Sequence, residues 1–323
     1  MTAIYLRRIV LALGLCLFTT IANAQFPDRP IHLVVPYPPG GLVDAMARTI
    51  QEPLSEILGQ PVIVENRTGA AGAIAARSVA QSPPDGYTLF FGNNGPSALV
   101  PLIQKDAGYD PINDFAAISL VATAPMVLVA HASVPATDLK GFIEFARGRV
   151  QGIEYSTAGI GSLGHLTTEL FAEKAGLKLV HVPYKGSAPA VMAVLTGEVK
   201  MYLSTMSDAL DAGIKAGKVR LLGVSTAVAS PLVPGAVPIA SVLPGFDITA
   251  WFGVLAARGT PAPIVARLNA AFRDVLGRPD IQQRFNGYGC SASASSPGEL
   301  ADMIAKEVPK WQSTIDMAGI KAQ

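Results

Sequence analysis

The sequence is poor in cysteine, in charged residues and in aromatic residues, and these shortages exclude several classes of protein. Of its 323 residues only 2 are cysteine, 7% are aromatic and 15% are charged, whereas 50% are hydrophobic. So high an apolar content excludes a disordered chain. Lys and Arg total 25 against 24 Asp and Glu, so the basic surface that nucleic-acid binding requires is missing. We therefore expect a folded protein without a nucleic-acid partner.

Long hydrophobic runs are also missing, except at the amino terminus. Arg7 and Arg8 precede an apolar run over residues 9–21, which is followed by Ala22-Asn23-Ala24. A basic stretch, a short apolar core and an Ala-x-Ala site together are typical of a secretory signal peptide. The run is shorter than the roughly 20 residues that cross a bilayer. The sequence thus predicts a signal peptide over residues 1–24 and an exported mature chain that begins at Gln25.

Signatures of catalysis and of metal binding are absent as well. The four histidines are scattered, with no pair at metal-ligand spacing: His32, His131, His165 and His181. Cys290 is the single cysteine left in the mature chain, so no internal disulfide is expected. No paired-carboxylate, Ser/His/Asp or Cys/His pattern can be found. We expect no metal, no cofactor and no catalytic residue.

Short apolar runs alternate with helical patterns along the chain. Runs typical of strands cover Ile31–Pro36, Val62–Glu65, Tyr87–Phe91, Ile118–Ala122, Met126–Ala130, Ile153–Ser156, Leu179–Val182, Val199–Leu203, Leu221–Ser225 and Trp251–Ala256. Helical spacing covers Met46–Leu58, where Pro53 is expected to kink or restart the helix, then Pro263–Gly277 and the stretch after Ser296-Pro297. This alternation predicts an α/β fold of mostly parallel sheets covered by helices. About 300 mature residues suffice for two lobes, and the Pro- and Gly-rich stretch Ala227–Phe246 is interpreted as a connection near their boundary.

Ligands of α/β proteins bind beyond the carboxyl ends of the strands, so the loops there are the candidate sites. Loop one, residues 36–44, contains the candidate ligand-binding residues Tyr37, Pro39, Gly40, Gly41, Leu42 and Asp44. Two glycines at a helix start let backbone N–H groups approach an anion, which the helix dipole also attracts. Asp44 could cap this helix. The alternative is a rigid turn without a ligand.

Loop two, residues 156–165, contains the candidates Ser156, Thr157, Gly159, Gly161, Ser162 and His165. With Gly164, its glycines match the dinucleotide fingerprint G-x-G-x-x-G, but the acid expected about 20 residues later is missing. We therefore interpret the loop as a second cradle for an anion. His165 either contacts the ligand or bonds within the loop.

Other strand ends contribute small polar candidates. Tyr184 and Lys185 follow one strand, Asn93 follows another, and Ser204 follows a third. A hydrolase elbow around Ser162 would need glycine two residues earlier, where Ile160 stands. An exported hydrolase-like enzyme using Ser162 and His165 is nevertheless the alternative to a binding protein.

Motifs along nearly the whole mature chain resemble those of one receptor family. They are Arg29-Pro30-Ile31, Val34-Val35-Pro36, Pro39-Gly40-Gly41, Asp44, Ala47-Arg48, Val64-Glu65-Asn66-Arg67, Gly69-Ala70, Gly72, Pro84-Asp85-Gly86-Tyr87-Thr88-Leu89, Val182-Pro183-Tyr184-Lys185-Gly186, Ala216-Gly217-Lys218, Trp251-Phe252-Gly253 and Gly259-Thr260-Pro261. In this order they resemble the Bug-type solute receptors of tripartite tricarboxylate transporters.

The resemblance implies a type II periplasmic binding protein of the Venus flytrap kind, with two α/β lobes and two crossovers between them. Lobe one would hold residues 25–125 and 228–323, and lobe two residues 126–227. It also implies a small carboxylate ligand, held by backbone amides of both loops and passed to membrane subunits of a transporter. We expect a monomer in the periplasm. A sensor that binds the same ligand for a signalling partner stays open as an alternative.

Three departures from the family pattern bear on the ligand. Leu42-Val43 stand where many members place a Ser or Thr, Ser204 stands where many have an acid, and the stretch 238–245 lacks a Glu. Losing a hydroxyl and an acid makes the cleft more apolar. We therefore expect a carboxylate with an apolar or aromatic body rather than a small amino acid.

Overall fold

One continuous sheet organises the computed structural model, which describes residues 26–317 and 319–320. Ten strands of these residues follow the order β2-β1-β3-β9-β4-β7-β5-β6, with β8 and β10 also paired to β4. Their bounds are β1 Ile31–Val35, β2 Val62–Asn66, β3 Thr88–Asn93, β4 Phe115–His131, β5 Ile153–Thr157, β6 Leu179–Pro183, β7 Met201–Thr205, β8 Val219–Val224, β9 Thr249–Ala257 and β10 Ser291–Ala292. The predicted signal peptide, residues 1–24, lies outside the described residues.

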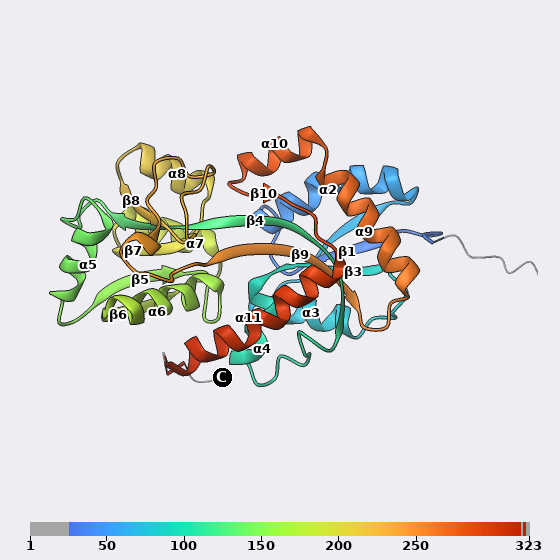
Figure 1. The fold of residues 1–323 in the computed structure, drawn as a ribbon, viewed down its shortest axis with the longest axis horizontal. Coiled ribbons are helices and arrows are strands. Elements are labelled where there is room, and N and C mark those ends of the chain that lie inside the picture. The colour runs from blue at the N-terminus through green and yellow to red at the C-terminus, as the bar shows by residue number, and fades with distance from the viewer. Residues whose placement is uncertain (1–25, 318, 321–323) are drawn as a thin grey trace, which may run out of the picture.

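Helices cover both faces of this sheet (Figure 1). They are α2 Leu42–Leu58, α3 Ala73–Ala80, α4 Val100–Ile103, α5 Leu139–Arg147, α6 Leu163–Ala175, α7 Ser187–Thr196, α8 Asp208–Lys215, α9 Ala262–Leu276, α10 Pro279–Gly287 and α11 Pro297–Met317, with short turns η1 Ala70–Gly72, η2 Gly95–Leu99 and η3 Ile239–Ser241. None of these helices combines the length and apolarity that a membrane crossing needs. The predicted helices at 263–277 and after Ser296-Pro297 are confirmed as α9 and α11.

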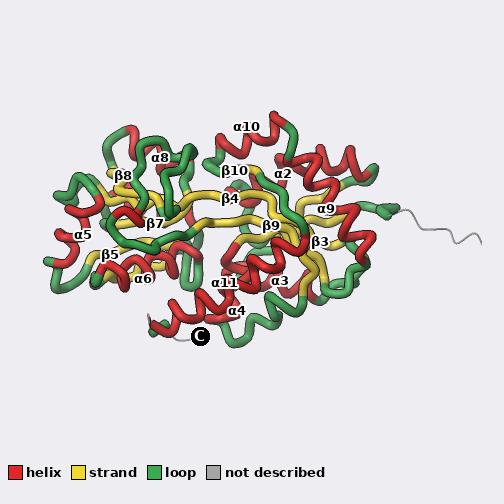
Figure 2. Tube along the Cα trace, in the orientation of Figure 1, coloured by secondary structure: helices red, strands yellow, loops and turns green. Residues whose placement is uncertain are grey.

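Two long strands, β4 and β9, connect the two lobes, as Figure 2 shows in yellow. Residues Phe115–Pro125 of β4 pair with β9, and Met126–His131 pair with β7 and β8. The sequence predicted two separate strands here, at 118–122 and 126–130, which was wrong. Pro125 keeps the chain extended and stands where β4 leaves β9 for β7, so one strand continues through both runs.

Strand directions confirm the α/β prediction for both lobes. The group β2-β1-β3 is parallel, and so is β6-β5-β7, while every antiparallel pair involves β4 or β9. Helices bury most of the inner strands β1, β3, β5 and β7, which explains their nearly continuous apolar sequences, whereas the edge strands β2 and β6 are only partly buried. The carboxyl ends of the parallel strands open into loops one and two.

Helix α2 differs from its prediction at Pro53, because it continues through this residue as one helix from Leu42 to Leu58. Met46, Ile50, Leu54 and Leu58 are all buried against the core. This apolar face outweighs the hydrogen bond that the proline removes.

Candidate functional site

Loop one connects strand β1 to helix α2, whose amino terminus has no side-chain cap. Pro39, Gly40 and Gly41 are exposed, and Gly40 adopts φ +84°, a left-handed conformation that favours glycine. The Gly40 N–H donates to Oδ2 of Asp44 at 2.9 Å and is therefore not free for a ligand. In the described part of the chain, the N–H groups of Gly41, Leu42 and Val43 donate to no protein acceptor. These groups, rather than that of Gly40, can bind an anion.

Asp44 shapes loop one from inside the first turn of α2. Its side chain is buried, and it accepts hydrogen bonds from Gly40 N, from Nε of Arg48 and from Nδ2 of Asn66, each at 2.9 Å. Burial alone would raise the pKa of this carboxyl, but the bonds from Arg48, Gly40 and Asn66 hold its pKa below the usual value. The expectation that Asp44 caps the helix is corrected, because Gly41 is the N-cap residue and makes no side-chain cap.

Tyr37 joins loop one to the end of strand β3. Its hydroxyl donates to Oδ1 of Asn93 at 2.9 Å. Burial raises the pKa of Tyr37 to about 12, although the bond to Asn93 acts in the opposite direction. The two predicted site residues are thus together, and the phenol keeps its proton at neutral pH.

A tight turn at residues 69–72 supports loop one and was not predicted to belong to the site. Ala70 and Ala71 adopt φ of 46° and 53°, and a Cβ on Gly72 would lie 3.0 Å or less from Pro36 and Pro96. Left-handed alanines are strained, and such strain often accompanies functional sites. The Asn66 amide, just before this turn, donates to the carbonyl of Tyr37 at 2.9 Å. The family motif over residues 64–72 was the only sequence signal for this support.

Loop two places helix α6 through internal hydrogen bonds. Ser162 is the N-cap residue, and its hydroxyl accepts the N–H of His165 and donates to the carbonyl of Gly159 at 2.8 Å. The N–H of Gly159 donates to Oγ1 of Thr157, and that of Gly161 donates to Nδ1 of His165, each at 3.2 Å. Within loop two, the N–H groups of Ala158, Ile160, Leu163 and Gly164 donate to no acceptor in the described part of the chain, whereas those of Gly159 and Gly161, predicted to cradle the anion, do.

The side chains of Ser162 and His165 do not form a nucleophile and base pair. The Ser162 proton goes to Gly159, and Nδ1 of His165 is occupied by the N–H of Gly161. A hydrolytic dyad would need a hydrogen bond between the hydroxyl and a ring nitrogen. This arrangement gives no support to the hydrolase alternative.

The two lobes meet at Gly161. With φ +79° it adopts a left-handed conformation, and a Cβ added there would lie 1.8 Å from Cδ1 of Ile103 on α4. Loop two is therefore in direct contact with the element that follows β3 and η2. We call this contact the closed arrangement.

Behind loop two, three aromatic rings form a stack. The rings of His165 and His181 are parallel with centroids 4.0 Å apart, and Tyr155 stacks on the other side of His181 at 5.0 Å. Nε2 of His181 bonds Oγ1 of Thr157 at 2.6 Å, and the Tyr155 hydroxyl donates to Glu169. The histidines that are scattered in sequence are thus partly gathered. Within the described residues, however, no group of three or more ligating side chains is placed to hold a metal.

Stability should depend on pH through this stack. Burial lowers the pKa of His165 to about 3, with His181 as a smaller cause, and burial lowers that of His181 to about 4. The folded protein stays neutral here while the unfolded chain takes up protons below about pH 6.5, so stability falls as the pH falls. We expect the free energy of unfolding to drop by about 4 kcal/mol more for the wild type than for H165N/H181N between pH 7.5 and 5.

Urea unfolding at both pH values measures this difference. The single variants H165N and H181N should each remove about half of it. Parallel pH profiles of the wild type and the double variant would show that the stack does not control the acid sensitivity.

The other predicted site residues differ in availability. The Ser156 hydroxyl is buried and donates to the carbonyl of Ala190 at 2.8 Å, so it is committed to the fold. The Tyr184 hydroxyl donates to Glu198 at 2.7 Å, and Lys185 is exposed. Ser204 is half-buried, with its Oγ 3.6 Å from the position of a Cβ on Gly164. Ser204 thus lies beside one of the free N–H groups of α6.

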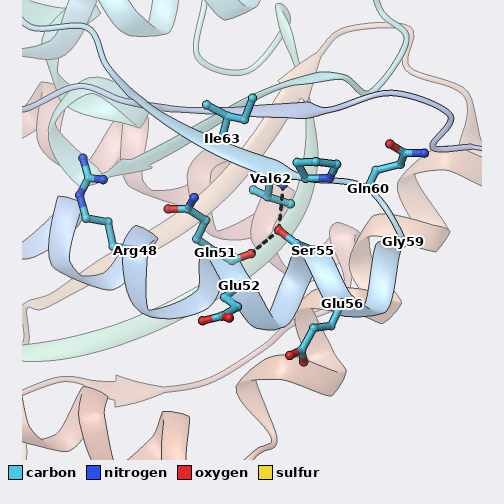
Figure 3. A pocket seen from close by; sticks show the side chains of 10 residues that line it. Arg48, Gln51, Glu52, Ser55, Glu56, Gly59, Gln60, Val62 and Ile63 are labelled. Atoms are coloured by element: carbon cyan, nitrogen blue, oxygen red, sulfur yellow. Dashed lines mark hydrogen bonds between the residues drawn. The ribbon is translucent and has the colours of Figure 1, made fainter.

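A separate pocket of about 830 Å³ lies along the carboxyl-terminal half of α2 and the edge strand β2 (Figure 3). Ser55 occupies its floor by donating to the Gln51 carbonyl and accepting the Val62 N–H at 2.8 and 2.9 Å. The free N–H groups of loop one are at the opposite end of α2. We therefore assign the candidate site to the loops and not to this pocket.

Comparison with known proteins agrees with this geometry. Residues 46–320 match the model of the tripartite tricarboxylate transporter family receptor. The chain belongs to this family. The predicted resemblance is thereby confirmed, and the family is one of periplasmic solute receptors. Protein BugT of Bordetella pertussis is 33% identical over 304 residues, which cover 93% of this chain and 93% of BugT.

Solved structures confirm the two-lobed fold of a periplasmic binding protein. An R. palustris protein solved with adipate has a TM-score of 0.84 and 36% identity, covering 92% of this chain and 99% of its own. MatC of Rhodopseudomonas palustris with bound malate has a TM-score of 0.80 and 33% identity, covering 90% and 100%. Periplasmic binding protein BugD has a TM-score of 0.82 and 31% identity, covering 92% and 100%.

Proposed function

We propose that this protein is a non-enzymatic receptor that binds a small carboxylated molecule between its lobes and delivers it to the membrane subunits of a tripartite tricarboxylate-type transporter. The observation that carries the proposal is the pair of open helix starts, at α2 and α6, each with N–H groups free of protein acceptors. The contact between Gly161 and Ile103 supports placing both loops at one site. In this proposal lobe one holds residues 25–125 and 228–323, lobe two holds residues 126–227, and the receptor acts as a periplasmic monomer after signal cleavage.

The charges around these loops favour recognition by backbone dipoles over a cationic clamp. Arg48 is bound to Asp44, and Lys185 is exposed. An anion at a helix start gains from the unpaired N–H groups and from the macrodipole together. Relatives solved with adipate and malate bind dicarboxylates, which suit two such cradles, one for each end of the ligand.

Apolar residues beside the cradles bear on the ligand body. Leu42 is half-buried at the start of α2, and Ser204 offers a hydroxyl rather than a charge beside α6. A site with few charges cannot hold the ammonium group of an amino acid without leaving it unpaired. We infer a preference for a carboxylate with an apolar chain or ring.

A thermal-shift panel of organic acids tests the proposal on the mature protein from Gln25. The panel should include adipate, malate, citrate, benzoate and glutamate. A ligand at 100 times its dissociation constant stabilises the folded state by about 2.7 kcal/mol, which raises the melting temperature by several degrees. We expect adipate or an aromatic acid to give a larger rise than glutamate. No shift with any acid, after unfolding and refolding to remove carried ligand, would contradict the carboxylate assignment.

A further inference from the structure

A half-buried carboxylate on the last helix holds the end of strand β3. Oε1 and Oε2 of Glu307, in the middle of α11, accept hydrogen bonds from Nδ2 of Asn94 at 2.9 and 3.0 Å. Asn94 is fully buried, and its Oδ1 accepts the backbone N–H of Trp251 at 2.8 Å. One amide side chain therefore ties together the turn after β3, the long strand β9 and helix α11.

Two buried indoles complete the surroundings of this carboxylate. The side chains of Trp251 and Trp311 face Glu307, yet neither indole N–H makes a hydrogen bond with it. Burial raises the pKa of Glu307, while Trp251, Asn94, Lys310 and Trp311 act against that increase. Only donors surround the carboxylate, so a residue that accepts through both oxygens fits this position and an amide does not.

The group formed by Glu307, Asn94 and the two indoles is adjacent in sequence to the candidate ligand site. Asn93, the neighbour of Asn94, accepts the hydroxyl of Tyr37 in loop one at 2.9 Å. Asn93 also pairs with Phe252, next to Trp251, in the ladder between β3 and β9. Of these two neighbouring asparagines, Asn93 thus holds loop one and Asn94 holds α11.

Helix α11 also reaches the second lobe. It packs against β4 and η2 and also against α6, the helix that follows loop two (Figure 1). A movement of α11 relative to β3 would therefore change how α6 sits opposite loop one. An element that contacts both lobes can bias the equilibrium between open and closed forms.

We propose that Glu307 is a positioning residue that favours the closed arrangement by holding α11, through Asn94, in register with strands β3 and β9. The inference rests on the proposed function for its effect on ligand affinity, but its effect on the lobes does not need a ligand. Replacing Glu307 with glutamine turns an amide donor toward Asn94 and the two indoles. The closed arrangement should then be less populated.

The test measures the distance between the lobes by pulsed electron spin resonance, with spin labels at I112C and V150C, two exposed positions of the mature chain. Native Cys290 is buried. We expect the ligand-free distance distribution of E307Q to shift to longer distances than that of the otherwise unchanged protein. N94A should give the same shift, and the double variant no larger one. The matched control is D302N, an exposed carboxylate on the same helix.

Adipate and malate serve as probes of affinity. For a probe that binds the wild type, E307Q should weaken binding roughly 5- to 20-fold, because a smaller population of the closed arrangement lowers the apparent affinity for a ligand that binds it. If neither probe binds the wild type, the proposed function loses support, but the ligand-free distances still decide the role of Glu307. Distributions of E307Q and N94A that superimpose on the wild type would overturn the inference, even if both variants melt earlier.

Discussion

The substitution G161L is expected to abolish carboxylate binding, and G161A to weaken it about tenfold. The alanine Cβ would lie 1.8 Å from Cδ1 of Ile103, and φ +79° adds strain of about 1–2 kcal/mol. Ile103 can turn its terminal methyl away from one carbon atom but not from a leucine side chain. The closed arrangement then becomes inaccessible, while each lobe keeps its own core.

Isothermal titration of the variants measures this effect. The double variant I103A/G161A should bind more tightly than G161A, because it removes the overlap and leaves only the backbone strain. G176L is the matched control, since Gly176 also has a left-handed φ, +63°, at the far end of α6 with open space around it. Binding by G161L equal to that of G176L would mean that the lobes do not close at Gly161.

Replacing Asp44 with alanine should lower the free energy of unfolding by about 2–4 kcal/mol. The variant leaves Gly40 N, the Arg48 guanidinium and the Asn66 amide without the buried carboxylate that accepts their hydrogen bonds. Loop one depends on all three bonds, so ligand affinity should fall as well. Urea unfolding and titration measure the two losses.

The matched control for this change is D211A on α8. Asp211 bonds Lys215 at 2.5 Å with the same four-residue spacing as Asp44 and Arg48, but this pair is exposed. An exposed ion pair contributes less than about 1 kcal/mol, so D211A should be close to the wild type. Equal losses from D44A and D211A would show that burial of the Asp44 network does not stabilise loop one.

The sequence sufficed for the fold class and for the location of both loops. Strands such as Ile31–Val35 are buried on two faces and therefore form continuous apolar runs, which are easy to recognise. The glycines and prolines in the loops after such strands predict where the next helices begin. The single strand β4 was missed, because an apolar run with a proline in it resembles two strands equally well.

Side-chain partners within the loops could not be read from local patterns. The N–H groups of Gly40 and Gly161 looked available, but each donates to a side chain four residues later, that of Asp44 or His165. Which groups stay free depends on rotamers, not on residue type. The stack of Tyr155 on His181 follows from the parallel register of β5 and β6, which pairs these two residues and which the sequence does not specify.

Contacts between distant segments were least accessible. Ile103 meets Gly161, and Asn94 meets Glu307 across 213 positions of sequence. No periodicity or motif links such residues, because their approach depends on how the two lobes and α11 are assembled.

Titration calorimetry of the mature protein with adipate, followed by mass analysis of the recovered ligand, tests the receptor assignment most directly. We expect saturable binding at one site with a dissociation constant near the micromolar range, which corresponds to a binding free energy of about 8 kcal/mol. The adipate should be recovered unchanged, and G161L should give no binding heat. Conversion of adipate to a product, or identical titrations of the wild type and G161L, would contradict a receptor that binds its ligand between two closing lobes.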